Sequence, residues 1–247
     1  SPATGDETVD SSIFYRSVFQ DIRGSTNSPV QASLMIIIGI DLSGPSNAAD
    51  TALVSFECQE SVLKLTQSVQ GASDADIFHL VSERAKESGV TVGLDAPLSY
   101  NDGGKDRPSD SELRSRTIAA GLRSGSVMTP TMNRMAYLTL RGISVAHQLL
   151  TIPRRPSIVE VHPGAVMALR GAPIDAVRSF KKSPEARMPL LNWLEQQGLQ
   201  SVVQDEFPTD HYVAACAAAL ATWKWSLQES VWLHSADPPA HPFDFAC

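Results

Sequence analysis

Long apolar runs are missing from this 247-residue chain, and that absence argues against a membrane protein. A membrane-spanning helix needs about 20 consecutive apolar residues, whereas the longest candidate run, residues 34–40, already ends at Asp41. The run also has no basic segment before it and no small-residue cleavage site after it, so it does not have the form of a secretory signal. We therefore expect a cytoplasmic protein without a membrane partner.

Cysteine is scarce as well, and several motifs of common enzymes are missing. The three cysteines, Cys58, Cys216 and Cys247, are odd in number and widely spaced, which predicts neither a disulfide framework nor a zinc site. The sequence has no Gly-x-x-x-x-Gly-Lys-Ser/Thr loop, no Gly-x-Ser-x-Gly elbow and no His-Glu-x-x-His pair. These absences argue against P-loop ATPases, serine hydrolases with that elbow and zinc metalloproteases.

The net charge of −7 argues against nonspecific binding to nucleic acid, but the charge is distributed unevenly. Residues 103–187 contain 14 Lys and Arg and 6 Asp and Glu, a balance of +8, and the rest contains 6 and 21, a balance of −15. A basic middle segment in an acidic protein is typical of a site for an anionic ligand. The alternative is that these cations are scattered over solvated helix faces.

The order of the apolar segments indicates an α/β fold. Residues 1–32, rich in Ser, Thr, Asp and Gly, predict a mobile extension, and residues 33–247 predict a single domain. Strands are predicted at residues 34–40, 51–58, 61–69, 90–95 and 157–161. A short hairpin link and a right-handed helical crossover then give a mixed five-stranded sheet flanked by helices. In this sheet strands 1–3 are antiparallel, and strands 4 and 5 are parallel to strand 1.

Two of the predicted strands end alike, because Gly-Ile-Asp closes the first at Asp41 and Gly-Leu-Asp closes the fourth at Asp95. Ligands of open α/β sheets bind beyond the carboxyl ends of the strands. Two neighbouring aspartates repel each other unless one is protonated or a cation lies between them. Since Mg²⁺ prefers carboxylate oxygens and water, the pair predicts a metal site. The alternative is that each aspartate caps the turn that follows it.

Glu160 ends the fifth predicted strand and is a candidate third carboxylate. Hydrolases with two metal ions about 3.5–4 Å apart need several carboxylates around them. The alternative for Glu160 is a solvent-facing position on an edge strand. His162, two residues later, is either a proton carrier or phosphate contact, or a structural histidine at the strand end.

A candidate anion site lies at a predicted helix start, where Thr129-Pro130 places a proline at the first helical position. Free N–H groups at a helix N-terminus attract anions, and the hydroxyl of Thr131 and the guanidinium of Arg134 add to that attraction. Arg141, about two helical turns later, is within reach of the same anion or of an internal carboxylate. The alternative is that Thr129 is simply the helix cap.

Five ordered segments together resemble domain-of-unknown-function family 429 (DUF429), whose members are predicted nucleases of the RNase H-like type. The segments are residues 39–45, 93–99, 129–135, 138–142 and 160–165. The resemblance runs from Met35, which resembles the usual start of such proteins, to the final helix. It implies an RNase H-like fold and a Mg²⁺- or Mn²⁺-dependent site of Asp41, Asp95 and Glu160, completed by an acidic residue on the last helix.

The last helix departs from the family's pattern, because Ala214-Ala215 stands where the family usually has Asp-Ala. Asp210, one turn earlier on the same face, is the expected substitute as a metal ligand, and His211 is the other candidate. Substrate contacts are expected from Ser43, Thr131, Arg134, Arg141 and His162.

These residues support a leading hypothesis and two alternatives. The first is a metal-dependent phosphodiester hydrolase that acts on nucleic acid or a nucleotide. The second is an RNase H-like nucleic-acid or nucleotide-binding module without catalysis, which the alanine at position 214 favours. The third is an ATP-dependent phosphotransferase of the actin and sugar-kinase type, which has a similar turn after its first strand. A single domain is too short for the two-lobed clamp of that third class.

Overall fold

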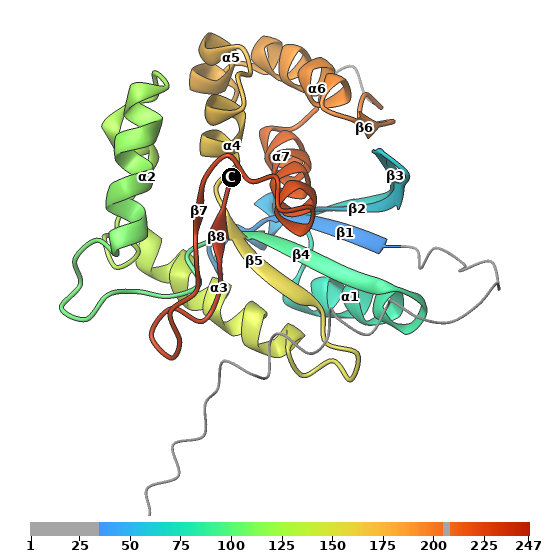
Figure 1. The fold of residues 1–247 in the computed structure, drawn as a ribbon, viewed down its shortest axis with the longest axis horizontal. Helices are drawn as coiled ribbons and strands as arrows, with labels where there is room; N and C mark the ends of the chain where they lie inside the picture. The colour runs from blue at the N-terminus through green and yellow to red at the C-terminus, as the bar shows by residue number, and fades with distance from the viewer. Residues whose placement is uncertain (1–34, 205–207) are drawn as a thin grey trace, which may run out of the picture. The chain divides into compact units, whose positions relative to one another are not determined.

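The computed structural model describes residues 35–204 and 208–247, which belong to one compact unit, Leu34–Cys247 (Figure 1). The predicted extension at residues 1–32 lies outside the described residues. The centre of the unit is one mixed β-sheet flanked by helices, so the predicted α/β class is confirmed. None of the described helices is both long enough and apolar enough to cross a membrane.

Within the described residues the sheet has eight strands, in the order β6-β3-β2-β1-β4-β5-β8-β7. Five of them correspond to the predicted strands: β1 (Met35–Asp41), β2 (Ala52–Gln59), β3 (Val62–Gln70), β4 (Gly89–Asp95) and β5 (Ser157–Val161). The predicted count of five was too low, because two-residue strands extend the sheet at both ends. These are β6 (Leu199–Gln200), β7 (Leu233–His234) and β8 (Phe245–Ala246).

The directions of the five longer strands agree with the prediction. β1, β2 and β3 form an antiparallel meander, β4 is parallel to β1, and β5 is parallel to β4. The apolar run of β1 is continuous because both of its faces are buried. Ile36, Ile38 and Ile40 belong to the hydrophobic cluster on one face of the sheet, and Ile37 belongs to the cluster on the other face.

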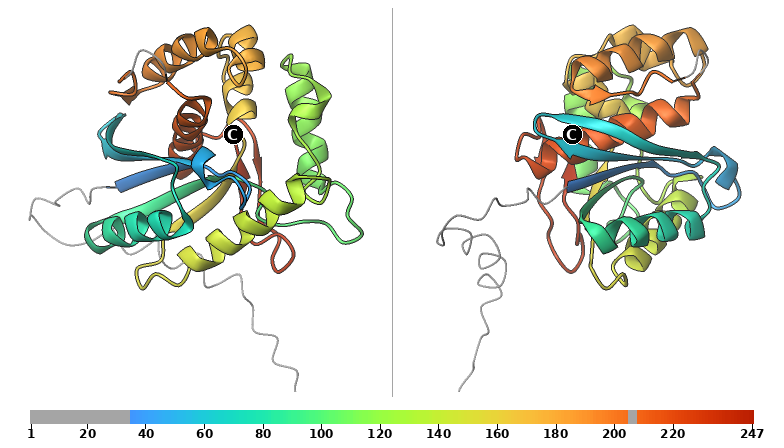
Figure 2. Two further views of the ribbon diagram at one scale, coloured as in Figure 1. Left: turned by 180° about the vertical axis from the view of Figure 1, so that it is seen from behind. Right: turned by 90° about the vertical axis from the view of Figure 1, so that its right-hand side faces the viewer.

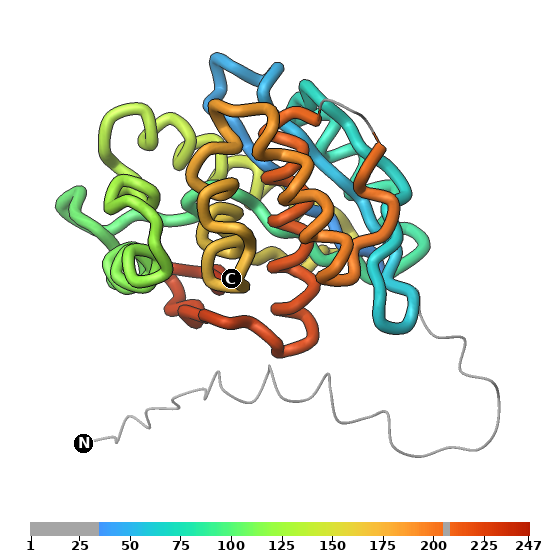
Figure 3. The backbone as a smooth tube through the Cα atoms, turned by 90° about the horizontal axis from the view of Figure 1, so that it is seen from above, coloured from blue at the N-terminus to red at the C-terminus, as the bar shows by residue number. Residues whose placement is uncertain are grey.

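Helices cover both faces of the sheet (Figures 1 and 2). They are α1 (Asp74–Glu87), α2 (Pro108–Ala119), α3 (Met135–Leu149), α4 (Pro163–Leu169), α5 (Ile174–Ser179), α6 (Arg187–Gln196) and α7 (Asp210–Ser226). α1 and α3 pack on the face that carries Ile36, Ile38 and Ile40. α7 packs on the opposite face, beside α4 and α6 (Figure 3).

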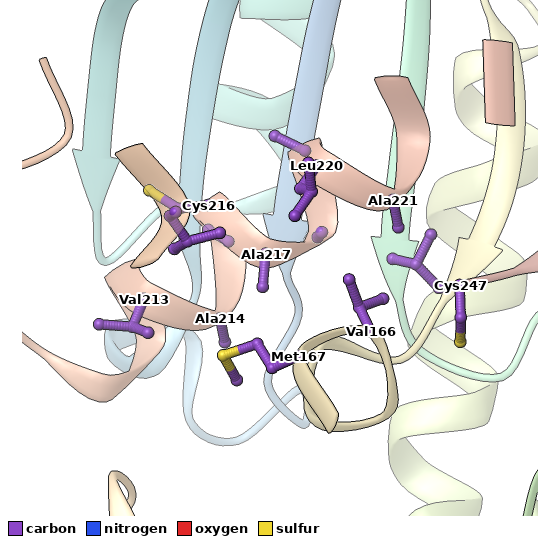
Figure 4. Packing of buried hydrophobic residues seen from close by; sticks show 14 of the residues in the cluster. Val166, Met167, Val213, Ala214, Cys216, Ala217, Leu220, Ala221 and Cys247 are labelled. Carbon is purple, nitrogen blue, oxygen red and sulfur yellow. The ribbon is translucent and has the colours of Figure 1, made fainter. Parts of the chain in front are cut away.

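The centre of that second face is filled by α7, whose residues from Tyr212 to Trp223 are all buried. Figure 4 shows Val166 and Met167 of α4 directed toward the small side chains of α7. Because half of these side chains are alanine methyl groups, the helix can lie close to the sheet and to α4. The packing therefore fixes the position of α7 and the directions in which its side chains face the sheet.

Two glycines set how closely α7 approaches the sheet. A Cβ atom on Gly39 of β1 would lie 2.2 Å from the carbonyl oxygen of Ala215, and one on Gly93 of β4 would lie 1.9 Å from Oγ1 of Thr222. No side chain fits at either position. Each glycine precedes a strand-end aspartate by two residues, so the glycine and the aspartate face the same side. The repeated Gly-x-Asp pattern thus places the first turns of α7 beside the aspartates.

One predicted helix start is wrong, because α3 begins at Met135 and not at Thr129-Pro130. The hydroxyl of Thr129 donates a hydrogen bond to the carboxylate of Asp106 instead of capping a helix. Residues 129–134 form turns, with Asn133 in the left-handed region at a φ of 48°. Thr131 and Arg134 therefore precede the helix and do not form its first turn.

Candidate active site

Asp41 and Asp95 lie side by side at the carboxyl ends of β1 and β4. The two residues are register partners in this parallel pair of strands, so their side chains project on the same face of the sheet. That face is the one covered by α7. Asp41 is 8% exposed, and Asp95 is partly buried. The structure thus brings together the two carboxylates on which the metal prediction was based.

The electrostatics of this pair favour a proton or a cation between the two groups. The pKa of Asp95 is raised well above its usual range, first because burial penalises the charged form and then because of the neighbouring charge of Asp41. The charge of Lys181 acts in the opposite direction, and that of Glu160 adds a smaller increase. A bound cation relieves the same repulsion without requiring a proton.

His211, in the first turn of α7, contacts one member of this pair, Asp41. Its Nδ1 lies 2.6 Å from Oδ2 of Asp41, and its Nε2 lies 4.0 Å from Oδ1 of Asp50. The hydrogen bond with Asp41 raises the pKa of the imidazole, against an opposing effect of burial. Of the two candidates on this helix, His211 is therefore the one that reaches a strand-end carboxylate, that of Asp41.

Asp210, the expected fourth ligand, points elsewhere. Its Oδ1 lies 3.4 Å from Nη2 of Arg187, the first residue of α6. Consecutive residues of a helix project about 100° apart, so the turn that directs His211 toward Asp41 directs Asp210 toward Arg187. The carboxylate therefore helps to hold α6 against α7.

Glu160 is bound by a buried arginine that sequence patterns did not reveal. Nη2 and Nη1 of Arg107 lie 2.6 and 2.8 Å from the two oxygens of Glu160, in a bidentate ion pair. The backbone N–H of Leu98 donates to the same carboxylate at 2.9 Å. Arg107 also binds Asp110 at 2.7 Å, and all three charged residues of this network are less than 5% exposed.

The register of β5 explains why Glu160 does not join the two aspartates. Its partner on β4 is Leu94 and not Asp95. Leu94 and Ile158 belong to the cluster on the α1 and α3 face, whereas Val159 and Val161 belong to the α7 face. Since side chains alternate along a strand, this register offsets Glu160 from Asp41 and Asp95, although Glu160 and Asp95 line the same cavity. The structure therefore brings two of the three predicted carboxylates together, and the third joins a separate ion pair.

Ser43 and Arg141, two of the expected substrate contacts, are bound to each other. Nη1 of Arg141 donates to the carbonyl oxygen of Ser43 at 2.8 Å and to Oγ1 of Thr51 at 2.8 Å. Its Nε donates to Asp74 at 2.8 Å. Arg141 is 5% exposed, so its hydrogen bonds stabilise the turn that follows Asp41 from inside the protein.

His162 lines the cavity described below, but both of its ring nitrogens are engaged. Nδ1 accepts a hydrogen bond from the backbone N–H of Ala165 and so caps α4, and Nε2 lies 2.8 Å from the carbonyl oxygen of Ser126. Burial lowers the pKa of the imidazole, which favours the neutral form with its proton on Nε2. This arrangement corresponds to the structural alternative for His162.

Thr131 and Arg134 lie apart from the aspartate pair. Oγ1 of Thr131 donates to the carbonyl oxygen of Gly104 at 2.8 Å, which fastens two loops together. Arg134 is exposed at the N-cap position of α3. Neither residue is among those that line the cavity beside Asp95.

A cavity of about 580 Å³ opens beside Asp95. Its wall is formed by the ends of β4 and β5, residues 122–128, the start of α3, residues 177–182 and Ala214 of α7. Asp95 lines this cavity and Asp41 does not. A ligand in the cavity therefore meets the aspartate pair from the Asp95 side.

The residues present fit one divalent cation better than two. Mg²⁺ is commonly held by one or two carboxylates, with water and substrate phosphates as its other ligands, and Asp41 and Asp95 offer such a set. Over residues 35–204 and 208–247, however, no group of three or more His, Cys, Asp and Glu is arranged to hold a metal ion. Glu160 is neutralised by Arg107, and position 214 carries only a methyl group.

Two further residues at the site carried no clear sequence signal. Arg107 lies in a polar loop whose composition suggests solvent exposure, and only its distant partner Glu160 explains its burial. Lys181 follows α5 in a segment that is far from the aspartates in sequence, although its charge lowers the pKa of Asp95. The excess of basic residues between positions 103 and 187 was the one available indication of both.

A family model described as "Protein of unknown function (DUF429)" matches residues 39–240, most of the chain. No curated protein matches it at a significant level.

Proposed function

We propose, from the premise that this chain belongs to the DUF429 family, that it is a metal-dependent phosphodiester hydrolase of the RNase H-like type. The observation that carries the proposal is the register pair of Asp41 and Asp95 at the ends of adjacent parallel strands. The strand sequence β3-β2-β1-β4-β5, an antiparallel meander followed by parallel strands, agrees with such a fold. Nucleic acid or a nucleotide is the proposed substrate.

The aspartate pair would hold one Mg²⁺ or Mn²⁺ ion. The chemistry that this ion supplies when bound is the activation of water and the neutralisation of charge on the phosphoryl oxygens. His211 holds one carboxylate oxygen of Asp41 and fixes the orientation of that group. Lys181 lies on the cavity wall, where its ammonium group attracts the substrate phosphate toward Asp95.

Glu160 takes a positioning role in this proposal and is not a metal ligand. Its carboxylate joins β5 to Leu98, just beyond Asp95, and to Arg107 at the start of α2. Three donors to one buried carboxylate fix the segment that follows β4. The network thus stabilises the backbone on which Asp95 is placed.

The test is hydrolysis of bis(p-nitrophenyl) phosphate and of DNA, RNA and hybrid oligonucleotides with added Mn²⁺ or Mg²⁺. We expect metal-dependent cleavage that is lost in Asp41→Asn and Asp95→Asn while both variants remain folded. Asp102→Asn, on an exposed loop away from the pair, serves as the matched control and retains the activity. Unchanged cleavage in both site variants would remove the mechanism.

A specific observation also favours a second function, a nucleotide-binding module without catalysis. In the described part of the chain the carboxylates do not form a ligand set of three or more, and position 214 is alanine. Such a module retains the cavity and the aspartate pair but binds without cleaving. Ligand binding in the presence of Mn²⁺, with no cleavage of any substrate in the panel, would identify this case.

A further inference from the structure

The cavity beside Asp95 has dimensions that bear on the identity of the substrate. Pockets for small molecules usually measure about 300–1,000 Å³, and this one measures about 580 Å³. Asp41 is 8% exposed and does not line the cavity. A phosphate that approaches the aspartate pair through the cavity therefore meets Asp95 first.

Three cations on the cavity wall are available for an anion. Arg123, Lys181 and Lys182 are exposed, and their side chains form no hydrogen bond or ion pair with any described residue. The other two wall arginines are engaged, because Arg107 binds Glu160 and Arg178 donates to the carbonyl oxygen of Gly121. The available positive charge exceeds the negative charge of Asp95, which favours an anionic ligand.

Much of the rest of the wall is apolar, and part of it is adaptable. Met128 is 39% exposed and Met135 is partly exposed, and neither belongs to the hydrophobic clusters of the fold. Methionine side chains adjust to flat ligands because they are unbranched and polarisable. The apolar lining includes Leu122, Val127, Met128, Met135, Leu138 and Phe180. An apolar wall beside free cations suits a ligand with an anionic end and a flat organic ring.

We infer that the substrate of this site is a small phosphate ester of nucleotide size, bound whole within the cavity, and not a nucleic-acid duplex. The inference rests on the proposed function for the chemistry, but binding itself requires no catalysis. The phosphate lies between Lys181 and Asp95, and the nucleoside contacts the methionine-lined wall. Arg123 and Lys182 attract the same anion from the rim.

Binding is measured by isothermal titration calorimetry with AMP, the dinucleotide ApA, a long single strand and duplex DNA, in chelator and then with Mn²⁺. We expect AMP and ApA to bind and the duplex not to bind. The double variant Lys181→Ala/Lys182→Ala loses about tenfold in affinity, as the removal of two exposed charge contacts implies. The matched control Lys64→Ala/Lys86→Ala removes the same charge from β3 and α1, away from the cavity, and retains the affinity.

A second variant, Met135→Trp, fills the cavity without removing a residue of either hydrophobic cluster, and we expect it to weaken AMP binding with no loss of folding. The inference is overturned if AMP and ApA fail to bind, if only long strands or duplexes bind, or if neither cavity variant changes the affinity. Tight binding of AMP without hydrolysis of any phosphodiester overturns the proposed function alone. Cleavage of long strands without binding of the small ligands overturns this inference and leaves the hydrolase proposal standing.

Discussion

Removing the charge of Arg107 should destabilise the protein strongly, because Arg107 is the common partner of two buried carboxylates. Arg107, Glu160 and Asp110 are 3%, 4% and 2% exposed. Arg107→Met preserves much of the side-chain volume but leaves both carboxylates without their cation. Breaking a buried ion pair by removing one partner typically costs about 3–5 kcal/mol. For a protein of this size that loss lowers the melting temperature by roughly 2–4 °C per kcal/mol.

The assay is urea unfolding followed by circular dichroism. The matched control is Arg116→Met, which removes an exposed arginine paired with Glu112 at 3.2 Å and should change the stability by less than about 0.5 kcal/mol. Adding Glu160→Gln to Arg107→Met should restore part of the loss, because one uncompensated charge disappears. A loss below about 1 kcal/mol for Arg107→Met would refute the argument that these buried charges depend on it.

Three further changes test other parts of the structure. In chelator, the free energy of unfolding of the wild-type protein should fall as pH rises from the usual aspartate pKa of about 3.9 through the raised pKa of Asp95. The reason is that the folded state binds the proton of Asp95 more tightly than the unfolded state does. Urea titrations over this pH range should show no such decrease for Asp95→Asn. Gly93→Ala should lower the free energy of unfolding by about 1–3 kcal/mol or more, since its Cβ would overlap Thr222. Gly125→Ala, where the added Cβ would face open space, should have little effect. Ala214→Asp should lower the stability in chelator and enlarge the rise in melting temperature on adding Mn²⁺, because Ala214 lines the cavity beside Asp95.

Much of the fold could be predicted from the sequence, because its main strands carry strong local signals. The isoleucine-rich run that ends at Asp41 is buried on both faces, and such a strand differs clearly from its polar neighbours. The Gly-x-Asp repeat predicted the two neighbouring aspartates correctly. The two-residue strands β6, β7 and β8 could not be predicted, since they depend only on hydrogen bonds to distant segments.

The errors at the site have a different physical origin, because they concern the direction of side chains. Glu160 was expected beside the aspartates on the basis of its position at a strand end, but its register partner is Leu94 and its carboxylate is bound by Arg107. Arg141 carries the charge expected of an anion contact, yet its donors are taken by Ser43, Thr51 and Asp74. Neither the register nor the partners of a buried arginine can be read from local sequence.

The central claim is that Asp41 and Asp95 together bind one divalent cation. Electron paramagnetic resonance of free and bound Mn²⁺ measures this directly in the wild-type protein and in Asp41→Asn, Asp95→Asn and Glu160→Gln. We expect one bound ion in the wild type, its loss in either aspartate variant, and its retention in any Glu160→Gln protein that folds. Full Mn²⁺ binding in both aspartate variants would contradict it.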